Sequence, residues 1–272
     1  MTLAGIDTHQ LLLLAPLLLL AGAAAGVTAG LLGVGGGIVL VPVLWNLFST
    51  LGVDESIRMH VAVGTSLATI IATSASSVRA HHKRGAVDVA LLRTWGPWIF
   101  AGVLIGTALA GSVRGRVLTL VFASMATIVA VYMGFSRPEW RVADQLPRGG
   151  PRAALAAIIG AVSAMMGIGG GTLSVPILSL FGYPMHRAVG TAAAVGFIIG
   201  VPGAIGFAIT GWNAPSLPPF SLGYVSLLGF ALIFPTSTLL APYGAKLAHG
   251  LNTRHLKRVF AVFLAVTAYR MF

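Results

Sequence analysis

Two glycine-rich clusters are the strongest chemical signal in the sequence. Residues 33–37 (Gly-Val-Gly-Gly-Gly) and residues 167–171 (Gly-Ile-Gly-Gly-Gly) each precede a short apolar segment that ends in proline. Consecutive glycines interrupt a helix, and a helix that begins after such a break directs free N–H groups and its positive dipole end at the break, where anions bind. We therefore expect the break amides to hold a negatively charged group. They belong to Gly35, Gly36, Gly37, Gly169, Gly170 and Gly171.

A second recurring pattern, His-x-x-x-Gly-Thr, could add donors to the same site. Its histidines are His60 and His186, and its threonines are Thr65 and Thr191. Histidine titrates near neutral pH, so each could donate to an anion or carry a proton; alternatively it caps its helix or reaches the membrane interface. The hydroxyls of both threonines and of the neighbouring Ser66 could donate to the site or bond to their own helix carbonyls.

The acidic residues are informative because none lies within an apolar run. The chain has six of them against seventeen lysines and arginines, and it has no cysteine. Cation carriers commonly place acids within their spans, and hydrolysis by general acid–base catalysis commonly uses paired carboxylates. The sequence thus disfavours a cation substrate and an enzyme, and it predicts no catalytic residue, no metal site and no cofactor.

The composition predicts an integral membrane protein. Only 8% of the residues are charged, against about 25% in a soluble domain, and mean hydropathy is +0.92. No Asp, Glu, Lys or Arg occurs between Asp7 and Asp54 or between Arg187 and Lys246. Such unbroken runs indicate helices, because barrel strands alternate. The net charge of +11 comes from cations in short connections, as membrane topology requires, so we expect a lipid bilayer around the chain and no nucleic-acid partner.

Apolar segments bounded by polar or glycine-rich links predict an all-α fold. Isolated glycines at every fourth position, such as Gly22, Gly26 and Gly30 or Gly102 and Gly106, are typical of close helix packing. The expected helices cover residues 10–32, 37–51, 60–78, 94–112, 117–136, 152–166, 172–181, 186–210, 222–245 and 254–271.

The chain is internally duplicated. Besides the glycine clusters, residues 59–65 match residues 185–191, and residues 118–123 match residues 256–261, in the same order. We predict a first membrane repeat over residues 1–136, a cytoplasmic linker over 137–151 and a second membrane repeat over 152–272. Each repeat would be a broken helix followed by three transmembrane helices, and duplicated halves of this kind indicate a transporter with its site at their interface.

Segment length and charge predict how the repeats are oriented. Only ten residues separate the second glycine cluster from the next turn, about 15 Å of helix, which is too short to cross a bilayer. If both broken helices are re-entrant hairpins, thirteen of the seventeen basic residues share one side; if both cross, the division is nine to eight. The positive-inside rule favours the first arrangement, which gives inverted repeats with six full spans. The segment over residues 10–32 is nevertheless long enough to span.

The doubled Gly-x-Gly-Gly-Gly…Pro segment, each copy followed by a helix that opens around Ala-Val-Gly-Thr, resembles the sulfite exporter TauE/SafE family of membrane permeases. The resemblance covers essentially the whole chain. It implies movement of small sulfur-containing anions, such as sulfite, thiosulfate or organosulfonates, across the bacterial inner membrane. Members differ in substrate and direction, so the resemblance implies neither for this chain; the expected direction is export. Thr172 and Ser174 replace the Ile38 and Leu40 of the first copy, so side-chain contacts there would make the two halves bind asymmetrically.

These observations favour an anion transporter that works by alternating access around the repeat interface. A passive anion channel is the alternative within transport, and it differs in showing neither saturation nor counterflow. A non-transporting membrane scaffold would tolerate valine at the glycine clusters except for folding. The sequence predicts a small anionic substrate and no particular oligomeric state.

Overall fold

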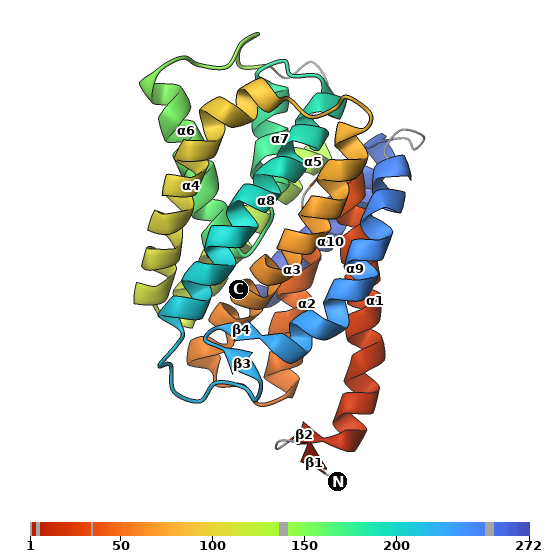
Figure 1. The fold of residues 1–272 in the computed structure, drawn as a ribbon, viewed down its shortest axis with the longest axis vertical. Helices are drawn as coiled ribbons and strands as arrows, with labels where there is room; N and C mark the ends of the chain where they lie inside the picture. Colours follow the sequence, from red (N-terminus) through yellow and green to blue (C-terminus); the bar gives the residue numbers. More distant parts are fainter. Residues whose placement is uncertain (1, 4–5, 34, 136–140, 248–252) are drawn as a thin grey trace.

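Ten α-helices make up nearly all of the described chain (Figure 1). The structure is a computed structural model. It describes the backbone of residues 2–3, 6–33, 35–135, 141–247 and 253–272, and the side chains of residues 15–33, 35–135, 141–247 and 261–272. Val34 of the first glycine cluster and the start of the expected linker, up to residue 140, therefore lie outside the described residues.

The helices follow one another with short connections. They are α1 (Thr8–Leu32), α2 (Gly37–Thr50), α3 (Glu55–His82), α4 (Val89–Ser112), α5 (Gly115–Phe135), α6 (Gly150–Met166), α7 (Gly171–Leu180), α8 (Met185–Thr210), α9 (Leu227–Leu247) and α10 (Thr253–Met271). Two small antiparallel hairpins accompany them, β1 (Thr2–Leu3) with β2 (Ile6–Asp7) and β3 (Ser221–Leu222) with β4 (Val225–Ser226). All ten expected helices are confirmed, with differences at their ends.

Three helix starts differ from the sequence prediction by five residues, each for a local reason. α3 begins five residues early because the Asp54 carboxylate accepts a hydrogen bond of 2.8 Å from the Ser56 amide. α4 also begins five residues early, because Asp88 accepts one of 2.9 Å from the Leu91 amide; both are N-caps. α9 begins five residues late because residues 221–226 form the hairpin β3–β4, whose turn holds Gly223 at a φ of 55°.

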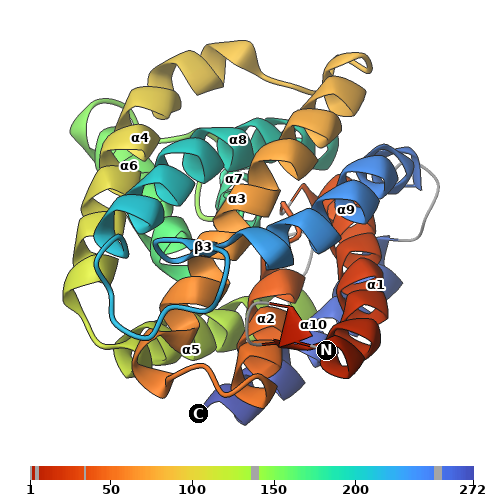
Figure 2. The ribbon, with the colours of Figure 1, turned by 60° about the horizontal axis from the view of Figure 1, so that its bottom comes forward.

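The helices of the two sequence halves interleave. α1 packs along α9 and α4 packs along α6, while α3 lies against α8 and α5 against α10. Figure 2 shows α3 and α8 in the middle of the molecule, with α1 and α9 on one side and α4 and α6 on the other. When the repeats are aligned, α1 corresponds to α6 and α9 to α4. The contact between α1 and α9 therefore corresponds to the contact between α6 and α4. The contacts between α3 and α8 and between α5 and α10 each join equivalent helices of the two repeats.

Glycines let the outer helix pairs approach closely. A Cβ atom built on Gly30 would overlap the carbonyl oxygen of Ala241 on α9, and one built on Gly106 would overlap that of Ala161 on α6. The same kind of approach is made by Gly22, Gly26 and Gly102. The prediction that these glycines serve helix packing is thus confirmed.

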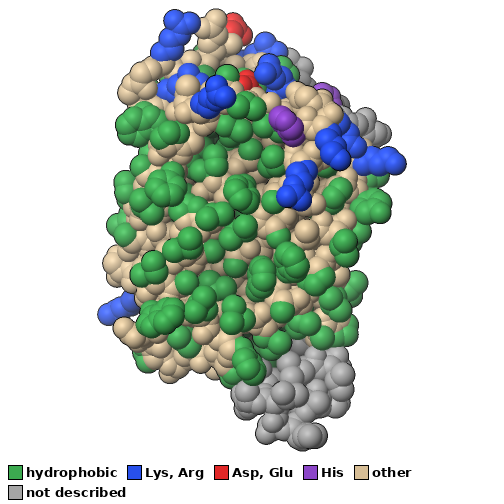
Figure 3. Space-filling model, viewed as in Figure 1, with side chains coloured by type: hydrophobic (Ala, Val, Ile, Leu, Met, Phe, Trp, Pro, Cys, Tyr) green, Lys and Arg blue, Asp and Glu red, His purple; other side chains and the backbone are tan. Residues whose placement is uncertain are grey.

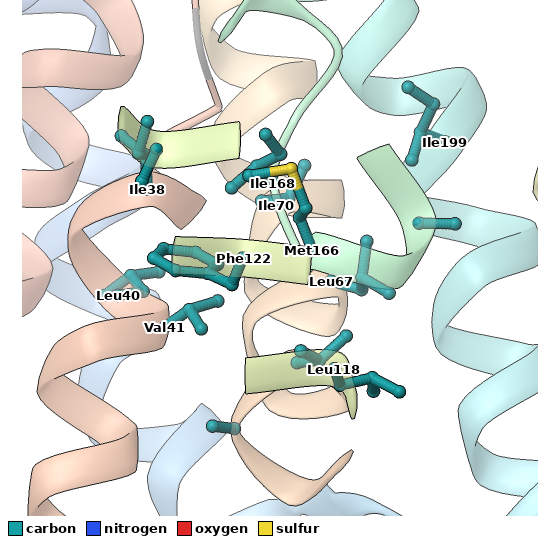
Figure 4. Close-up of a cluster of buried hydrophobic side chains, with 14 of the residues drawn as sticks. Ile38, Leu40, Val41, Leu67, Ile70, Leu118, Phe122, Met166, Ile168 and Ile199 are labelled. Carbon is teal, nitrogen blue, oxygen red and sulfur yellow. The ribbon is translucent and has the colours of Figure 1, made fainter. Parts of the chain in front are cut away.

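The outer ends of the two glycine-interrupted helix pairs lie at opposite ends of the molecule. In Figure 1 the outer ends of α1 and α2 lie at the lower end of the molecule, and the outer ends of α6 and α7 lie at the upper end. The glycine clusters join the two helices of each pair deep in the interior. Side chains that flank these junctions form the centre of the core, among them Ile38 and Val41 on α2, Met166 on α6, and Ile168 (Figure 4).

Six helices are long and apolar enough to cross a membrane, counted over the described residues: α3, α4, α5, α8, α9, and α1 over Ala15–Leu32. The chain is thus a multi-pass membrane protein. The expected number of full spans is also six, but the expected set has α10 in place of α1, and the part of α10 with described side chains, Ala261–Met271, is short. Figure 3 shows a broad belt of hydrophobic side chains, with lysine and arginine gathered mostly at one end.

Candidate anion site at the two glycine corners

Each glycine cluster forms a sharp backbone corner between two helices; residues 33–37 are called the first corner and residues 167–171 the second corner. In the first corner Gly33, Gly35 and Gly36 have φ values of 67°, 70° and 78°. In the second, Gly167 ends α6 at a φ of 67°. This left-handed region is readily adopted only by glycine, so the backbone geometry itself requires several of these residues.

The two corners lie against each other. A Cβ atom built on Gly35 would lie 3.0 Å from Cα of Gly169, and one built on Gly37 would overlap the carbonyl oxygen of Gly167 and lie 2.9 Å from Cα of Ile168. All these residues are buried. The backbones of the two halves therefore meet directly at these described residues, with the Ile70 side chain beside the contact.

The corners lie near the middle of the long helices. The side chain of Ile70 on α3 lies next to Gly35 and Gly37, and a Cβ atom built on Gly170 would lie 3.0 Å from Cδ1 of Ile199 on α8. Ile70 and Ile199 are close to the midpoints of helices of 28 and 26 residues. At 1.5 Å per residue these helices are about 40 Å long, so the corners lie at about half the height of the helical bundle.

Ser66 is the predicted hydroxyl residue that the structure places at a corner. Its Oγ donates a hydrogen bond of 2.7 Å to the carbonyl oxygen of Gly167. The neighbouring Thr65 has a different partner, since its Oγ1 accepts a hydrogen bond of 2.9 Å from the Ser226 amide in β4, directly before α9. Ser66 therefore joins α3 to the second corner, whereas Thr65 joins it to the β3–β4 hairpin.

Thr191 occupies the equivalent position in the second half. Its Oγ1 accepts a hydrogen bond of 2.9 Å from the Asp88 amide, directly before α4. The glycine that precedes each threonine lets the partner backbone approach: a Cβ atom on Gly190 would lie 2.5 Å from the carbonyl oxygen of Ala86, and one on Gly64 would overlap that of Tyr224. Each Gly-Thr pair thus marks a helix crossing between the two halves. Gly64 and Thr65 on α3 contact the residues before α9, and Gly190 and Thr191 on α8 contact the residues before α4.

The two histidines lie at helix starts, away from the corners. His60 is buried in the first turns of α3, with Nε2 3.0 Å from the carbonyl oxygen of Ala110 and its ring 4.8 Å from that of Tyr224. His186 is exposed on the first turn of α8. Ten residues of helix, about 15 Å, separate His60 from Ile70, and nine separate His186 from Val195 at the second corner.

The second corner carries hydrogen-bond donors that have no acceptor among the described residues. The amides of Gly169, Gly170 and Gly171 make no backbone or side-chain hydrogen bond there. The hydroxyls of Thr172 and Ser174, in the first turn of α7, are at most 2% exposed and have no partner within that part of the chain. Buried polar groups in native proteins are almost always paired, so this set of donors needs an explanation.

Ser74 adds a donor that was not predicted from the sequence. It is fully buried on α3 and makes no hydrogen bond to the residues described. A Cβ atom built on Gly196 would lie 2.6 Å from Oγ of Ser74 and 3.8 Å from Cα of Gly169, which places this hydroxyl beside the second corner. Its signal in the sequence is the hydroxyl-rich run over residues 73–77 inside an otherwise apolar helix.

The donor set is uncharged. The acidic residues with described side chains are Asp54, Glu55, Asp88 and Asp144, all at or beyond helix ends. Neutral N–H and O–H donors can stabilise a small anion through hydrogen bonds and the dipole of the following helix. They bind it less strongly than an arginine pair would, which suits a ligand that must also leave.

Comparison with known proteins places the chain among membrane transporters. Residues 18–271 match the family described as Sulfite exporter TauE/SafE. A probable membrane transporter protein of Haemophilus influenzae is 36% identical over 94% of this chain and 97% of its own length. One of Methanocaldococcus jannaschii is 27% identical over 94% of this chain and 95% of its own. None of the solved structures matches. The chain belongs to the sulfite exporter TauE/SafE family.

Proposed function

We propose that the protein transports a small sulfur-containing anion, such as sulfite, thiosulfate or an organosulfonate, and that the second corner holds its charged head. The observation that carries the proposal is the group of buried donors without described acceptors: three successive amides, Thr172, Ser174 and Ser74. Buried donors without an acceptor are costly unless a ligand pairs with them. The family description supplies the substrate class.

The two corners contribute unequally to this site. Ile38 and Leu40 occupy the first-corner positions that correspond to Thr172 and Ser174, and both are fully buried. Both corners therefore offer the anion backbone amides, while the helix that follows the first corner adds apolar side chains and the helix that follows the second adds hydroxyl donors. An oxyanion with one apolar face, such as a sulfonate, matches this division, with its oxygens on the second corner and its carbon chain toward the first.

We further propose that the halves are inverted repeats, with α1–α2 and α6–α7 as re-entrant hairpins from opposite membrane faces. The reciprocal packing of α1 on α9 and α6 on α4 supports this topology, as does the position of the outer hairpin ends in Figure 1. The end rich in lysine and arginine would face the cytoplasm, according to the positive-inside rule. In a bacterial cell the membrane would be the inner membrane.

Alternating access would part the corners. Gly35 and Gly37 meet Gly167 and Gly169 backbone to backbone, and the side chains of Val41 and Ile70 that pack beside this contact would have to part with it. The crossings at Thr65–Ser226 and Thr191–Asp88 lie toward opposite ends of the bundle, and they are natural places for one end to open while the other stays closed.

Transport in proteoliposomes tests the proposal. We expect saturable uptake of at least one of radiolabelled sulfite, thiosulfate and taurine-derived sulfonates, with acceleration by unlabelled anion on the opposite side. Non-saturating flux without such counterflow would indicate a channel instead. If liposomes with the correctly folded protein move none of the three anions, the proposed substrate class is wrong.

A further inference from the structure

A second candidate binding site lies between the C-terminal parts of α3 and α9, outside the glycine corners. It is a hollow of about 540 Å³ whose wall carries four cationic side chains and a tyrosine. These residues are Arg79, Lys83, Arg84, Lys246 and Tyr243. The hollow therefore brings together four positively charged side chains, two arginines and two lysines.

No carboxylate with a described side chain neutralises these cations. Two of the four described acidic residues, Asp54 and Glu55, lie at the opposite end of α3. The other two, Asp88 and Asp144, form ion pairs with Arg187 and Arg141. Cations near helix C-termini do interact favourably with the helix dipole, and Nη1 of Arg84 lies 3.1 Å from the carbonyl oxygen of Ala80. The helix dipole and the positive-inside rule both favour cations at this end, and the hollow brings four of them within reach of a single anionic ligand.

The surroundings of the hollow indicate a lipid rather than a free anion. On α9, Leu239 is 68% exposed one turn before Tyr243, which is itself 63% exposed, and both belong to the lipid-facing apolar surface. The end of the molecule with most lysine and arginine lies directly above the hydrophobic belt in Figure 3. The hollow thus lies where a phosphate group would be at headgroup level while its acyl chains run down along α9.

We propose that this hollow binds the phosphate headgroup of an acidic phospholipid. Arg79, Lys83, Arg84 and Lys246 hold the phosphate, and Leu239 and Tyr243 pack against the first carbons of the acyl chains. Basic pockets between transmembrane helices on the cytoplasmic side recognise anionic headgroups in this way. The site does not depend on which anion the corners transport.

Native mass spectrometry of the full chain in a neutral detergent tests the site. We expect the wild type to retain phosphatidylglycerol in preference to phosphatidylcholine. Lys83→Gln with Lys246→Gln should reduce that retention about tenfold, while the charge-preserving pair Lys83→Arg with Lys246→Arg should keep it. Arg114→Gln with Arg116→Gln removes the same charge at the opposite end and should have no effect. Unchanged elution in size-exclusion chromatography establishes that each variant is folded.

Three results would overturn the proposal. The first is equal retention of phosphatidylglycerol and phosphatidylcholine by the wild type. The second is unchanged retention in the glutamine pair. The third is displacement of the lipid by millimolar inorganic phosphate, because it would identify the ligand as a soluble anion.

Discussion

Ser66 Oγ donates a hydrogen bond of 2.7 Å to the carbonyl oxygen of Gly167, which lies 101 residues away in the other half of the chain. Val63, one turn earlier on α3, also packs on this glycine, since a Cβ atom built there would lie 2.8 Å from Cα of Val63. The middle of α3 therefore fixes the position of the second corner. Movement of the corner must break this bond or carry α3 with it.

Ser66→Ala should destabilise the protein by about 1 kcal/mol, because it leaves the buried Gly167 carbonyl without its side-chain donor. The thermal midpoint in detergent measures the effect. Ser112→Ala is the matched control, since Ser112 is exposed and its hydroxyl bonds within its own helix. Equal midpoints for the two variants would contradict the role given to Ser66.

Thr65→Val and Thr191→Val should each lower stability by about 1–3 kcal/mol, because a buried or half-buried amide loses its acceptor. Serine at either position should restore most of the loss. Thr50→Val, at an exposed residue whose hydroxyl bonds within its own helix, serves as the control in thermal unfolding. Since both threonines lie at helix crossings, we expect the folded variants to keep their affinity for the anion; a selective loss of affinity at normal stability would place these hydroxyls in the binding site.

Gly37→Ala should force the two corners apart, because its Cβ atom would overlap the carbonyl oxygen of Gly167. We expect a stability loss of roughly 1–3 kcal/mol and a clear loss of flux in proteoliposomes. Gly96→Ala is the comparison, because its Cβ atom would lie 3.6 Å from the nearest side-chain atom, an ordinary contact. Wild-type flux in Gly37→Ala would show that contact between the corners is irrelevant to transport.

Asp88→Asn tests the connection between the α3–α4 turn and the α7–α8 turn. Burial raises the pKa of Asp88, but hydrogen bonds from the Tyr183 hydroxyl and the Leu91 amide, together with Arg187, outweigh it and hold the pKa below its usual range. Burial and the hydrogen bond to Asp88 raise the pKa of Tyr183 to about 12. Because the folded pKa of Asp88 is lowered, its stabilisation is present at neutral pH and is lost as pH falls through that pKa.

The free energy of unfolding of the wild type should therefore exceed that of Asp88→Asn by about 1 kcal/mol at pH 7. The difference is modest because the Arg187 side chain is 51% exposed. Chemical unfolding across pH should show this difference shrinking below about pH 4. Asp144→Asn, in a far more exposed pair, should change stability by less than about 0.5 kcal/mol. If the difference in unfolding free energy between wild type and Asp88→Asn grew as the pH fell, folding would raise the pKa of Asp88 rather than lower it, and the prediction would be wrong.

The helices and the two breaks were predictable because each rests on local physics. Long uncharged runs must be helical in a bilayer, and consecutive glycines there have few purposes other than breaking a helix. The early starts of α3 and α4 were also readable, since Asp54 and Asp88 directly precede them. The start of α9 was not, because residues 222–226 are as apolar as the helix that follows.

Side-chain roles depended on the other half of the chain and could not be read locally. His60 stacks on Tyr224, and Thr65 meets Ser226, both more than 150 residues away. In the sequence, nothing distinguishes the hydroxyl of Ser74 from that of its neighbour Thr73, which donates a hydrogen bond to the carbonyl oxygen of Thr69 in its own helix. Only the position of α8 against α3 shows that Ser74 lies beside the second corner instead.

The most direct test of the anion site is thermal stabilisation of the purified protein by sulfite or thiosulfate, measured for wild type and for Thr172→Val with Ser174→Ala. The double variant loses no described hydrogen bond and removes two unpaired buried hydroxyls, so its midpoint without anion should equal or exceed that of the wild type. We predict a saturable rise in the midpoint for the wild type and little or no rise for the variant. An equal rise in both proteins would contradict the assignment of these hydroxyls, and with it the account of the second corner as the anion site.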